Sequence, residues 1–277
     1  MNGAVLVDGV GRSVAVEPPA RRVVSLVPSL TESAYDIGRG ETLVGVTRNC
    51  VEPAAARTIT RVGGTRHPDI AAIRRLAPDL VLLNAEENRR EDFAELEAAG
   101  LRLWVTHPRR CDDVAPMLRA LGRLLGGEAA AERHAARVDD LCATAIAGRL
   151  PRVFCPIWKN PWMGFNRDTY AHDVLRRAGG ANVLAQHRVR FPQVRLEEVA
   201  DHAPEVVLLP DEPYVFRERD VADLEALAET PALRAGRVVF CDGKDLTWFG
   251  TRTARAIPRL VRTISASEAP PRRSPPP

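Results

Sequence analysis

Residues 70–83, IAAIRRLAPDLVLL, decide the fold of this chain, because residues 196–209, LEEVADHAPEVVLL, repeat their pattern. Each copy has the apolar spacing of an amphipathic helix, followed by an Ala-Pro-acid turn and an aliphatic run typical of a buried strand. The turn contains Pro78 in the first copy and Pro204 in the second. One helix–proline–strand phrase is common in α/β proteins, but its recurrence predicts two similar lobes.

Outward from these copies, strand-like runs alternate with helical patterns in both halves of the chain. Strands separated by helices of this length predict βαβ units and a parallel sheet in each lobe. A hairpin is expected at residues 5–16, and Ser29 and Glu32 have the spacing of a helix capping box. The predicted strands lie at residues 22–27, 43–47, 80–83, 101–106, 152–158, 206–209 and 237–241.

The alternation stops between residues 112 and 148, where no β-type run occurs and apolar residues keep helical spacing. This region predicts one long helix or a closely coupled pair, since a helix of about 20 residues is about 30 Å long and can connect two lobes. The fold class is therefore α/β: two similar parallel-sheet lobes joined by a long backbone helix, with a ligand cleft between the lobes. The predicted parts are a first lobe at residues 1–110, a connecting helix at 111–148, a second lobe at 149–266 and a disordered proline-rich tail at 267–277.

The charge balance is mild, with 39 Lys and Arg against 36 Asp and Glu for a net charge of +3, so we expect no nucleic-acid partner. The five cysteines form no CxxC pair, which excludes a zinc ribbon and favours buried free thiols. The N-terminus lacks a signal-peptide pattern, and no apolar run reaches about 18 residues. These features predict a soluble cytoplasmic monomer; the alternative is an extracytoplasmic protein whose N-terminus is misassigned or processed.

Loops at the carboxyl ends of parallel strands carry the binding groups in open α/β sheets, so these loops are the candidate site. In the second lobe they are rich in aromatic residues and interrupted by Pro161 and Gly164, which predicts irregular surface loops that offer a ligand an apolar platform. The first-lobe loops are more polar, which suits a large ligand with both an apolar face and hydrogen-bonding edges. The loops are residues 158–166, 190–193 and 245–250 in the second lobe, and 48–50, 63–67 and 84–89 in the first.

Motifs for covalent chemistry are weak, because the sequence contains no P-loop, no GxGxxG and no GxSxG. We predict neither catalytic residues nor a resident metal, although Cys50, His67 and His107 are the residues that a metal site in the first lobe would use. One alternative is a cytosolic enzyme with its acid or base among His67, Glu86, Lys159 and Lys244. Another is an intracellular sensor that binds partners through the proline-rich tail.

Several segments resemble one known family when they are taken in order on both sides of the helical region. They are RVVSLVPSLTE (22–32), VGGT (62–65), NAEENRRED (84–92), IWKNPWM (157–163), AGGANVL (178–184), FPQVRLEEV (191–199) and LTWFGTR (246–252). Over about residues 5–265 the chain resembles the helical-backbone, or class III, substrate-binding proteins of ABC importers, and within them the branch that binds cobalamin. The resemblance implies two α/β lobes joined by a rigid helix and capture of a metal chelate, such as a corrinoid or a siderophore, without a covalent cofactor.

The resemblance also implies roles for individual residues. The first-lobe positions that are aromatic in the cobalamin branch are Thr65 and Asn84 here. Each lobe of that branch presents a glutamate to the importer permease; Glu197 matches in the second lobe, whereas the first-lobe position is Ala71, with Asp69 nearby. The aromatic positions that hold the corrin match Trp158, Trp162, Phe165, Phe191 and Trp248, the last together with Arg252.

We therefore predict a binding protein for a small-molecule metal chelate, with an ABC importer permease as its partner and Glu197 as a docking residue. The predicted ligand-binding residues of the first lobe are Ser29, Arg48, Cys50, Thr65, Arg66, His67, Asn84 and Glu86. Those of the second lobe are Trp158, Lys159, Trp162, Phe165, Phe191, Trp248 and Arg252.

Overall fold

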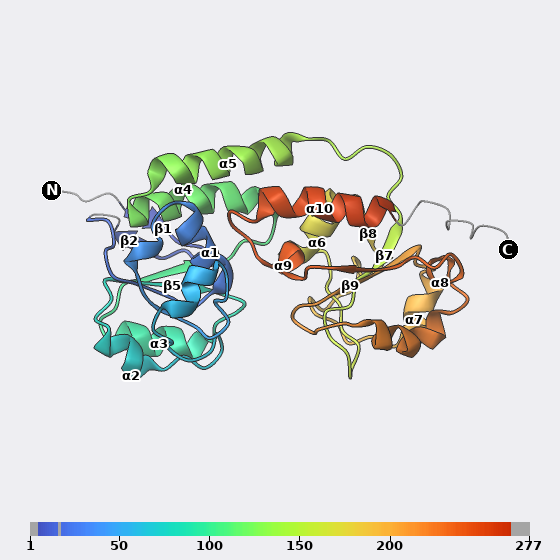
Figure 1. Ribbon diagram of the computed structural model, residues 1–277, viewed down its shortest axis with the longest axis horizontal. Helices are drawn as coiled ribbons and strands as arrows, with labels where there is room; N and C mark the ends of the chain where they lie inside the picture. Colours follow the sequence, from blue (N-terminus) through green and yellow to red (C-terminus); the bar gives the residue numbers. More distant parts are fainter. Residues whose placement is uncertain (1–4, 16–17, 267–277) are drawn as a thin grey trace. The chain divides into compact units, whose positions relative to one another are not determined.

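The computed structural model describes residues 5–15 and 18–266, and Figure 1 shows their secondary structure. These residues divide into two compact units. The first contains the described residues up to Thr144 together with Trp248–Ala254, and the second contains Ala145–Thr247 and the described residues from Arg255 on. Within the described ranges, no helix has both the length and the apolar character that crossing a lipid bilayer requires. The predicted tail at 267–277 and the last residue of the predicted hairpin, Val16, lie outside the described residues.

A parallel four-stranded sheet with the order β4-β3-β5-β6 forms the centre of the first unit. Its strands are buried along nearly their whole length, as the near-continuous apolar runs of the sequence predict for a parallel sheet covered on both faces. The N-terminal hairpin pairs β1 with β2 antiparallel, as expected. The strands are β1 (Val5–Val7), β2 (Ser13–Ala15), β3 (Val23–Ser25), β4 (Leu43–Val46), β5 (Leu80–Asn84) and β6 (Leu103–Thr106).

The helices of the first unit connect these strands. Three of them are single 3₁₀ segments, and the others are α-helices. They are α1 (Pro28–Asp36), η1 (Gly40–Thr42), η2 (Ala54–Thr58), α2 (Ile70–Arg75), α3 (Arg90–Ala98), η3 (Cys111–Asp113), α4 (Val114–Leu125) and α5 (Glu128–Ala143).

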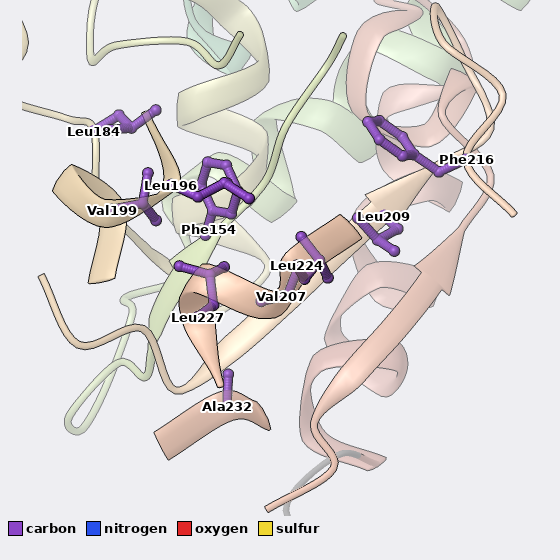
Figure 2. Packing of buried hydrophobic residues seen from close by; sticks show 10 residues of the cluster. All are labelled: Phe154, Leu184, Leu196, Val199, Val207, Leu209, Phe216, Leu224, Leu227 and Ala232. Carbon is purple, nitrogen blue, oxygen red and sulfur yellow. The ribbon is translucent and has the colours of Figure 1, made fainter. Parts of the chain in front are cut away.

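The second unit has a parallel sheet of its own with the order β10-β9-β7-β8. Figure 2 shows its core, in which buried side chains from β7, β9, α7, η4 and α8 pack together around Phe154. The strands are β7 (Arg152–Phe154), β8 (Ala181–Asn182), β9 (Val206–Pro210) and β10 (Val238–Cys241). The helices are α6 (Tyr170–Arg177), α7 (Leu196–Asp201), η4 (Glu218–Leu227), α8 (Pro231–Arg234), α9 (Lys244–Thr247) and α10 (Thr253–Ala266), whose first two residues belong to the first unit.

The two sheets have the same topology. Read from its opposite edge, the second sheet has the order β8-β7-β9-β10, which is the order of the first sheet with each strand replaced by its later counterpart. The repeated sequence motif supplies equivalent elements, since α2 leads into β5 in the first unit and α7 leads into β9 in the second. The predicted pair of similar parallel-sheet lobes is therefore confirmed.

The two copies of the motif also share side-chain contacts. Nε of Arg22, just before β3, donates to the carbonyl of Ala77 (3.2 Å), and Nε of Arg152, at the start of β7, donates to the carbonyl of Ala203 (2.8 Å). Both alanines have a φ of 45°, in the left-handed region. In each unit, the acidic residue that ends the Ala-Pro-acid turn exchanges hydrogen bonds with the backbone of the same arginine. A guanidinium thus satisfies carbonyl groups at the end of each short helix, where no further helical turn does so.

The helical region is a closely coupled pair rather than one long helix. Helix α4 ends at Gly126, which has a φ of 74°, and α5 begins two residues later. The pair packs so closely that a Cβ atom at Gly122 would lie 2.5 Å from the Cβ atom of Ala131. The left-handed turn at Gly126 reverses the chain, and the small residues on both helices allow the close approach.

The capping box expected at Ser29 and Glu32 is wrong. Helix α1 begins at Pro28, whose fixed φ suits the first helical position, and Val27 precedes it without a side-chain cap. Ser29 is therefore already inside the first turn. Glu32 instead pairs with an arginine from the segment Trp248–Ala254.

Candidate functional site

In the first unit, Asn84 organises the loop that follows β5. Its Oδ1 accepts hydrogen bonds from the amides of Glu86 (2.8 Å) and Glu87 (3.1 Å), and its Nδ2 donates to Oγ1 of Thr106 (3.2 Å). The side chain is buried. Asn84 therefore holds its own loop in place, and its amide is engaged within the unit.

Thr65 is fixed by a second buried amide. Nδ2 of Asn88 donates to the carbonyl of Thr65 (2.8 Å) and to that of Leu26 (3.3 Å), and so joins the loop after β5 to the Gly63-Gly64 turn and the end of β3. Gly63 needs its positive φ of 89° at this turn. Sequence reasoning did not select Asn88, although its position four residues after Asn84 in a strand-end loop was visible.

Three of the predicted polar residues lie at the surface of this edge. Arg48, Arg66 and His67 are exposed, and the guanidinium of Arg48 lies against the backbone of Gly64. Glu86 is half-buried and its Oε1 lies 3.1 Å from Nε2 of His107. These side chains place exposed or partly exposed charged and polar groups at this edge of the first unit.

Cys50 and Ser29 are interior residues. The Cys50 thiol is buried between the hydroxyl groups of Thr31 (3.1 Å) and Thr47 (3.2 Å), and burial raises its pKa. The Ser29 hydroxyl is also buried and has no hydrogen-bond partner among residues 5–15 and 18–266. All five cysteines are free thiols, and three of them, Cys50 included, are buried.

In the second unit, the loop after β7 forms a tight hairpin. The amide of Ile157 donates to the carbonyl of Met163 (2.8 Å), and the amide of Met163 donates to the carbonyl of Trp158 (3.1 Å). The turn contains the cis peptide bond between Asn160 and Pro161. We call residues 157–163 the aromatic hairpin.

The aromatic hairpin packs its two indole rings against the loop that follows β9. Trp162 stacks on Phe216 with ring centroids 5.8 Å apart and planes 7° apart, and Trp158 meets Tyr214 edge-on at 5.7 Å. Tyr214 and Phe216 are themselves 4.6 Å apart. Trp158 keeps 44% of its surface exposed, and Phe191 keeps 39%. The rings of Trp158, Trp162, Tyr214 and Phe216 therefore form one connected aromatic surface, in which Trp158 faces solvent, and Phe191 is a separate exposed ring.

Sequence reasoning missed Tyr214 and Phe216. Both follow β9, an aliphatic strand that was predicted, and they alternate along residues 213–216. The signal was the same as for the aromatic hairpin: aromatic residues directly after a buried parallel strand.

Three predicted residues are internal. The ring of Phe165 is only 1% exposed, so it fills the core of the second unit instead of facing a ligand. Trp248 and Arg252 are buried in the first unit, where the guanidinium lies 5.2 Å from the indole centroid. Arg252 also forms a two-pronged ion pair with Glu32, with N–O distances of 2.7 and 2.9 Å. Its charge is therefore neutralised within the unit.

Three of the four groups considered for acid–base chemistry, Glu86, Lys159 and Lys244, lie beside a group that carries or can carry the opposite charge. Nζ of Lys159 contacts Asp220 and Asp223, and Nζ of Lys244 lies 3.7 Å from Oδ1 of Asp242. Glu86 contacts His107, as described above. In the part of the chain that the structure describes, no three His, Cys, Asp or Glu side chains are grouped so that they could hold a metal ion.

The two positions compared with permease-docking residues lie on equivalent helices. Glu197 is exposed on α7, and Ala71 is exposed on α2. Asp69 caps α2, because its Oδ1 accepts the amide of Ala72 (2.8 Å). The acidic group near Ala71 is thus used by the helix itself.

Known proteins are similar to this chain in sequence and in fold. A family model described as periplasmic binding protein matches residues 23–244. The vitamin B12-binding protein of Vibrio cholerae serotype O1 is 28% identical over 193 residues, which are 68% of this chain and 70% of that protein. The solved structure of the periplasmic vitamin B12-binding protein BtuF of Vibrio cholerae has a TM-score of 0.79 at 25% identity and covers 90% of this chain and 98% of that one. The periplasmic heme-binding protein RhuT from Roseiflexus sp. RS-1 has a TM-score of 0.80 at 26% identity and covers 90% and 100%.

These findings correct one expectation and confirm another. The prediction of a cytoplasmic protein is wrong, since the matching family is that of periplasmic binding proteins and both solved structures are of periplasmic proteins. The resemblance to substrate-binding proteins of ABC importers is confirmed. With more than three quarters of its length matched by the family model, the chain belongs to the periplasmic binding protein family.

Proposed function

We propose that this protein binds a flat metal chelate of the corrinoid or heme class and delivers it to an ABC importer. The observation that carries the proposal is the connected aromatic surface of the second unit, in which Trp158 is exposed, together with the separate exposed ring of Phe191. Similarity to a vitamin B12-binding protein and to a heme-binding protein supports the same ligand class.

The physical argument concerns the exposed rings. Large aromatic side chains that remain in contact with water on a rigid loop gain free energy when an apolar ligand face covers them. A metal macrocycle offers such a face, and its periphery carries polar groups.

The test is a titration of the purified protein with hemin and with cyanocobalamin, followed by absorption spectroscopy and calorimetry. We expect saturable one-to-one binding of at least one of them. Trp158→Ala and Phe191→Ala should each weaken binding about tenfold, since truncation of a central aromatic contact costs about 1–2 kcal/mol. Phe240→Ala is the matched control, because Phe240 is an equally exposed aromatic residue of the same unit on strand β10. Absence of binding by both compounds, or equal loss with Phe240→Ala, would contradict the proposal.

For delivery of the ligand, we propose that Glu197 is a docking residue for the importer permease. A carboxylate exposed on α7 suits a basic partner surface, and it takes no part in the aromatic surface. We expect Glu197→Gln to leave the ligand dissociation constant unchanged and to reduce uptake of the ligand by cells that depend on this protein. Asp201→Asn, on the same helix, is the control for loss of a charge there. Unchanged uptake by Glu197→Gln would remove Glu197 from the docking surface.

A further inference from the structure

Lys159 sits on the aromatic hairpin but directs its charge into the protein. Its Nζ donates to Oδ1 of Asp220 at 2.6 Å and also contacts Oδ2 of Asp223, both on η4. The Lys159 side chain is 12% exposed. This lysine therefore joins the hairpin to a segment about sixty residues further along the chain.

Asp220 is a firm anchor for this contact. While its Oδ1 accepts from Lys159, its Oδ2 accepts the amide of Arg217 (2.8 Å) at the beginning of η4, and the carboxylate is buried. The hydrogen bond to Asp220 raises the pKa of Lys159, and the hydrogen bond from Lys159 lowers the pKa of Asp220. Both groups are consequently charged at neutral pH, and both oxygens of Asp220 are in use.

The ring contacts span the same two segments. Trp162 stacks on Phe216 and Trp158 packs edge-on against Tyr214, and both partners lie just before η4. Nζ of Lys159 lies 6.0 Å from the Trp162 ring centroid. The aromatic hairpin and residues 214–220 are thus held together by ring contacts and by the Lys159–Asp220 ion pair.

We propose that Lys159 is a positioning residue that holds the aromatic hairpin against residues 214–220 and so fixes the orientation of Trp158 and Trp162 for the ligand. This inference rests on the proposed function, because the rings matter only as a binding surface. It also replaces the expectation that the Lys159 ammonium itself touches the ligand or acts as an acid or base. The Lys159 ammonium donates its hydrogen bonds to two carboxylates, so we assign it the role of ordering the neighbouring rings before the ligand binds. The entropy cost of ordering these rings is then not incurred on binding.

The experiment uses the whole protein labelled with 5-fluorotryptophan and observed by fluorine NMR. The chain has four tryptophans, so four resonances are expected, and Trp158→Phe and Trp162→Phe assign two of them. Lys159→Met keeps the aliphatic stem and removes the charge. We expect it to shift or broaden the Trp158 and Trp162 resonances, to leave the other two unchanged, and to weaken hemin or cyanocobalamin binding about three- to tenfold. Lys159→Arg should restore both readouts in large part, since a guanidinium can reach the same carboxylates.

The second lysine of the chain provides the matched control. Lys244→Met also removes a lysine that lies near an aspartate, Asp242, but it should change neither the two resonances nor the affinity. Asp223→Asn is the milder variant for use if Lys159→Met folds poorly, and it should give a smaller change in the same direction.

The outcomes separate this inference from the proposed function. If Lys159→Met leaves the Trp158 and Trp162 resonances in place, or moves them without changing affinity, the positioning role is overturned. If the wild-type protein binds neither compound, the proposed function fails, while the resonances still report whether Lys159 orders the hairpin.

Discussion

The two units share a scaffold and differ in their loops. Both contain a parallel sheet of the same strand order, and both use an arginine to cap the helix that precedes a central strand. At the carboxyl edge both units have buried asparagines that bond to loop backbone, but they differ in their aromatic residues. The first unit places buried amides there, such as Asn84 and Asn88, which bond to loop backbone. The second places indole and phenyl rings there, and some of them face solvent.

This difference separates two uses of a strand-end loop. A polar side chain whose hydrogen bonds stay within its own unit contributes to stability, whereas the exposed part of an aromatic ring is available for binding. Function in a duplicated scaffold is therefore found where the copies have diverged, and stability where they agree.

The largest expected effect compares ion pairs of the two units. In the first unit, Arg252→Met would remove the guanidinium that pairs with the buried Glu32 carboxylate, which costs about 3–5 kcal/mol. In the second unit, Arg259→Met removes the partner of Asp245, but Arg259 is itself 39% exposed, so the loss should be clearly smaller. Chemical denaturation of both variants measures the difference. Equal losses would show that burial does not distinguish the two pairs.

A smaller effect compares the loops themselves. Asn84→Ala removes the acceptor of two loop amides and should lower the free energy of unfolding by about 1–3 kcal/mol. Trp158→Ala should lower it by about 1 kcal/mol or less, because 44% of the residue is already exposed and the loss is mainly that of the edge-on contact with Tyr214. Thermal or urea unfolding of the ligand-free protein checks both. A large loss for Trp158→Ala would mean that the exposed ring is structural.

The next effect is the pH dependence of the free energy of unfolding that the Lys159–Asp220 pair contributes, which is at most about 1 kcal/mol. The pKa of Asp220 is lowered from its ordinary 3.8, so the stabilisation is present above that value and is lost as the pH falls through the lower folded pKa. The pKa of Lys159 is raised from its ordinary 10.5, so the stabilisation is present below that value and is lost as the pH rises through the higher folded pKa. The Tm difference between wild type and Lys159→Met should therefore be flat from pH 5 to 9 and narrow outside that range. A difference that instead peaks at low pH would contradict this assignment.

The smallest effect tests the equivalence of the two copies. Ala77→Gly and Ala203→Gly replace the two alanines that have a φ of 45°. Relief of the left-handed strain exceeds the added entropy of the unfolded glycine, so each variant should be stabilised by about 0.5 kcal/mol. Equal shifts of Tm are expected. Opposite signs would show that the two turns are not equivalent.

Much of this fold was predictable from sequence because the scaffold depends on local patterns. The repeated helix, proline turn and aliphatic strand fixed the two lobes, and parallel strands buried on both faces were visible as apolar runs. Strand β8 was missed because it has only two residues and depends on pairing with β7. The start of α1 was misplaced because Pro28, rather than Ser29, provides the first helical residue.

The site was less predictable because its geometry depends on contacts between distant residues. The pattern around Phe165 could not distinguish a ring in the core from a ring on a platform, and burial makes it a core residue. Lys159 was predicted to bind the ligand, but its carboxylate partners lie on η4, far along the chain. Local pattern contains no information about such a pairing.

The segment Trp248–Ala254 has a practical consequence for anyone who wishes to dissect or recombine this protein. It belongs to the first unit although the residues on either side belong to the second, and it supplies the Arg252 that neutralises Glu32. A fragment cut at Thr144 would lack this insert and would retain the buried Glu32 carboxylate without the Arg252 guanidinium. A chimera that exchanges the first unit with that of a relative must therefore exchange two segments, the one that ends at Thr144 and the segment Trp248–Ala254.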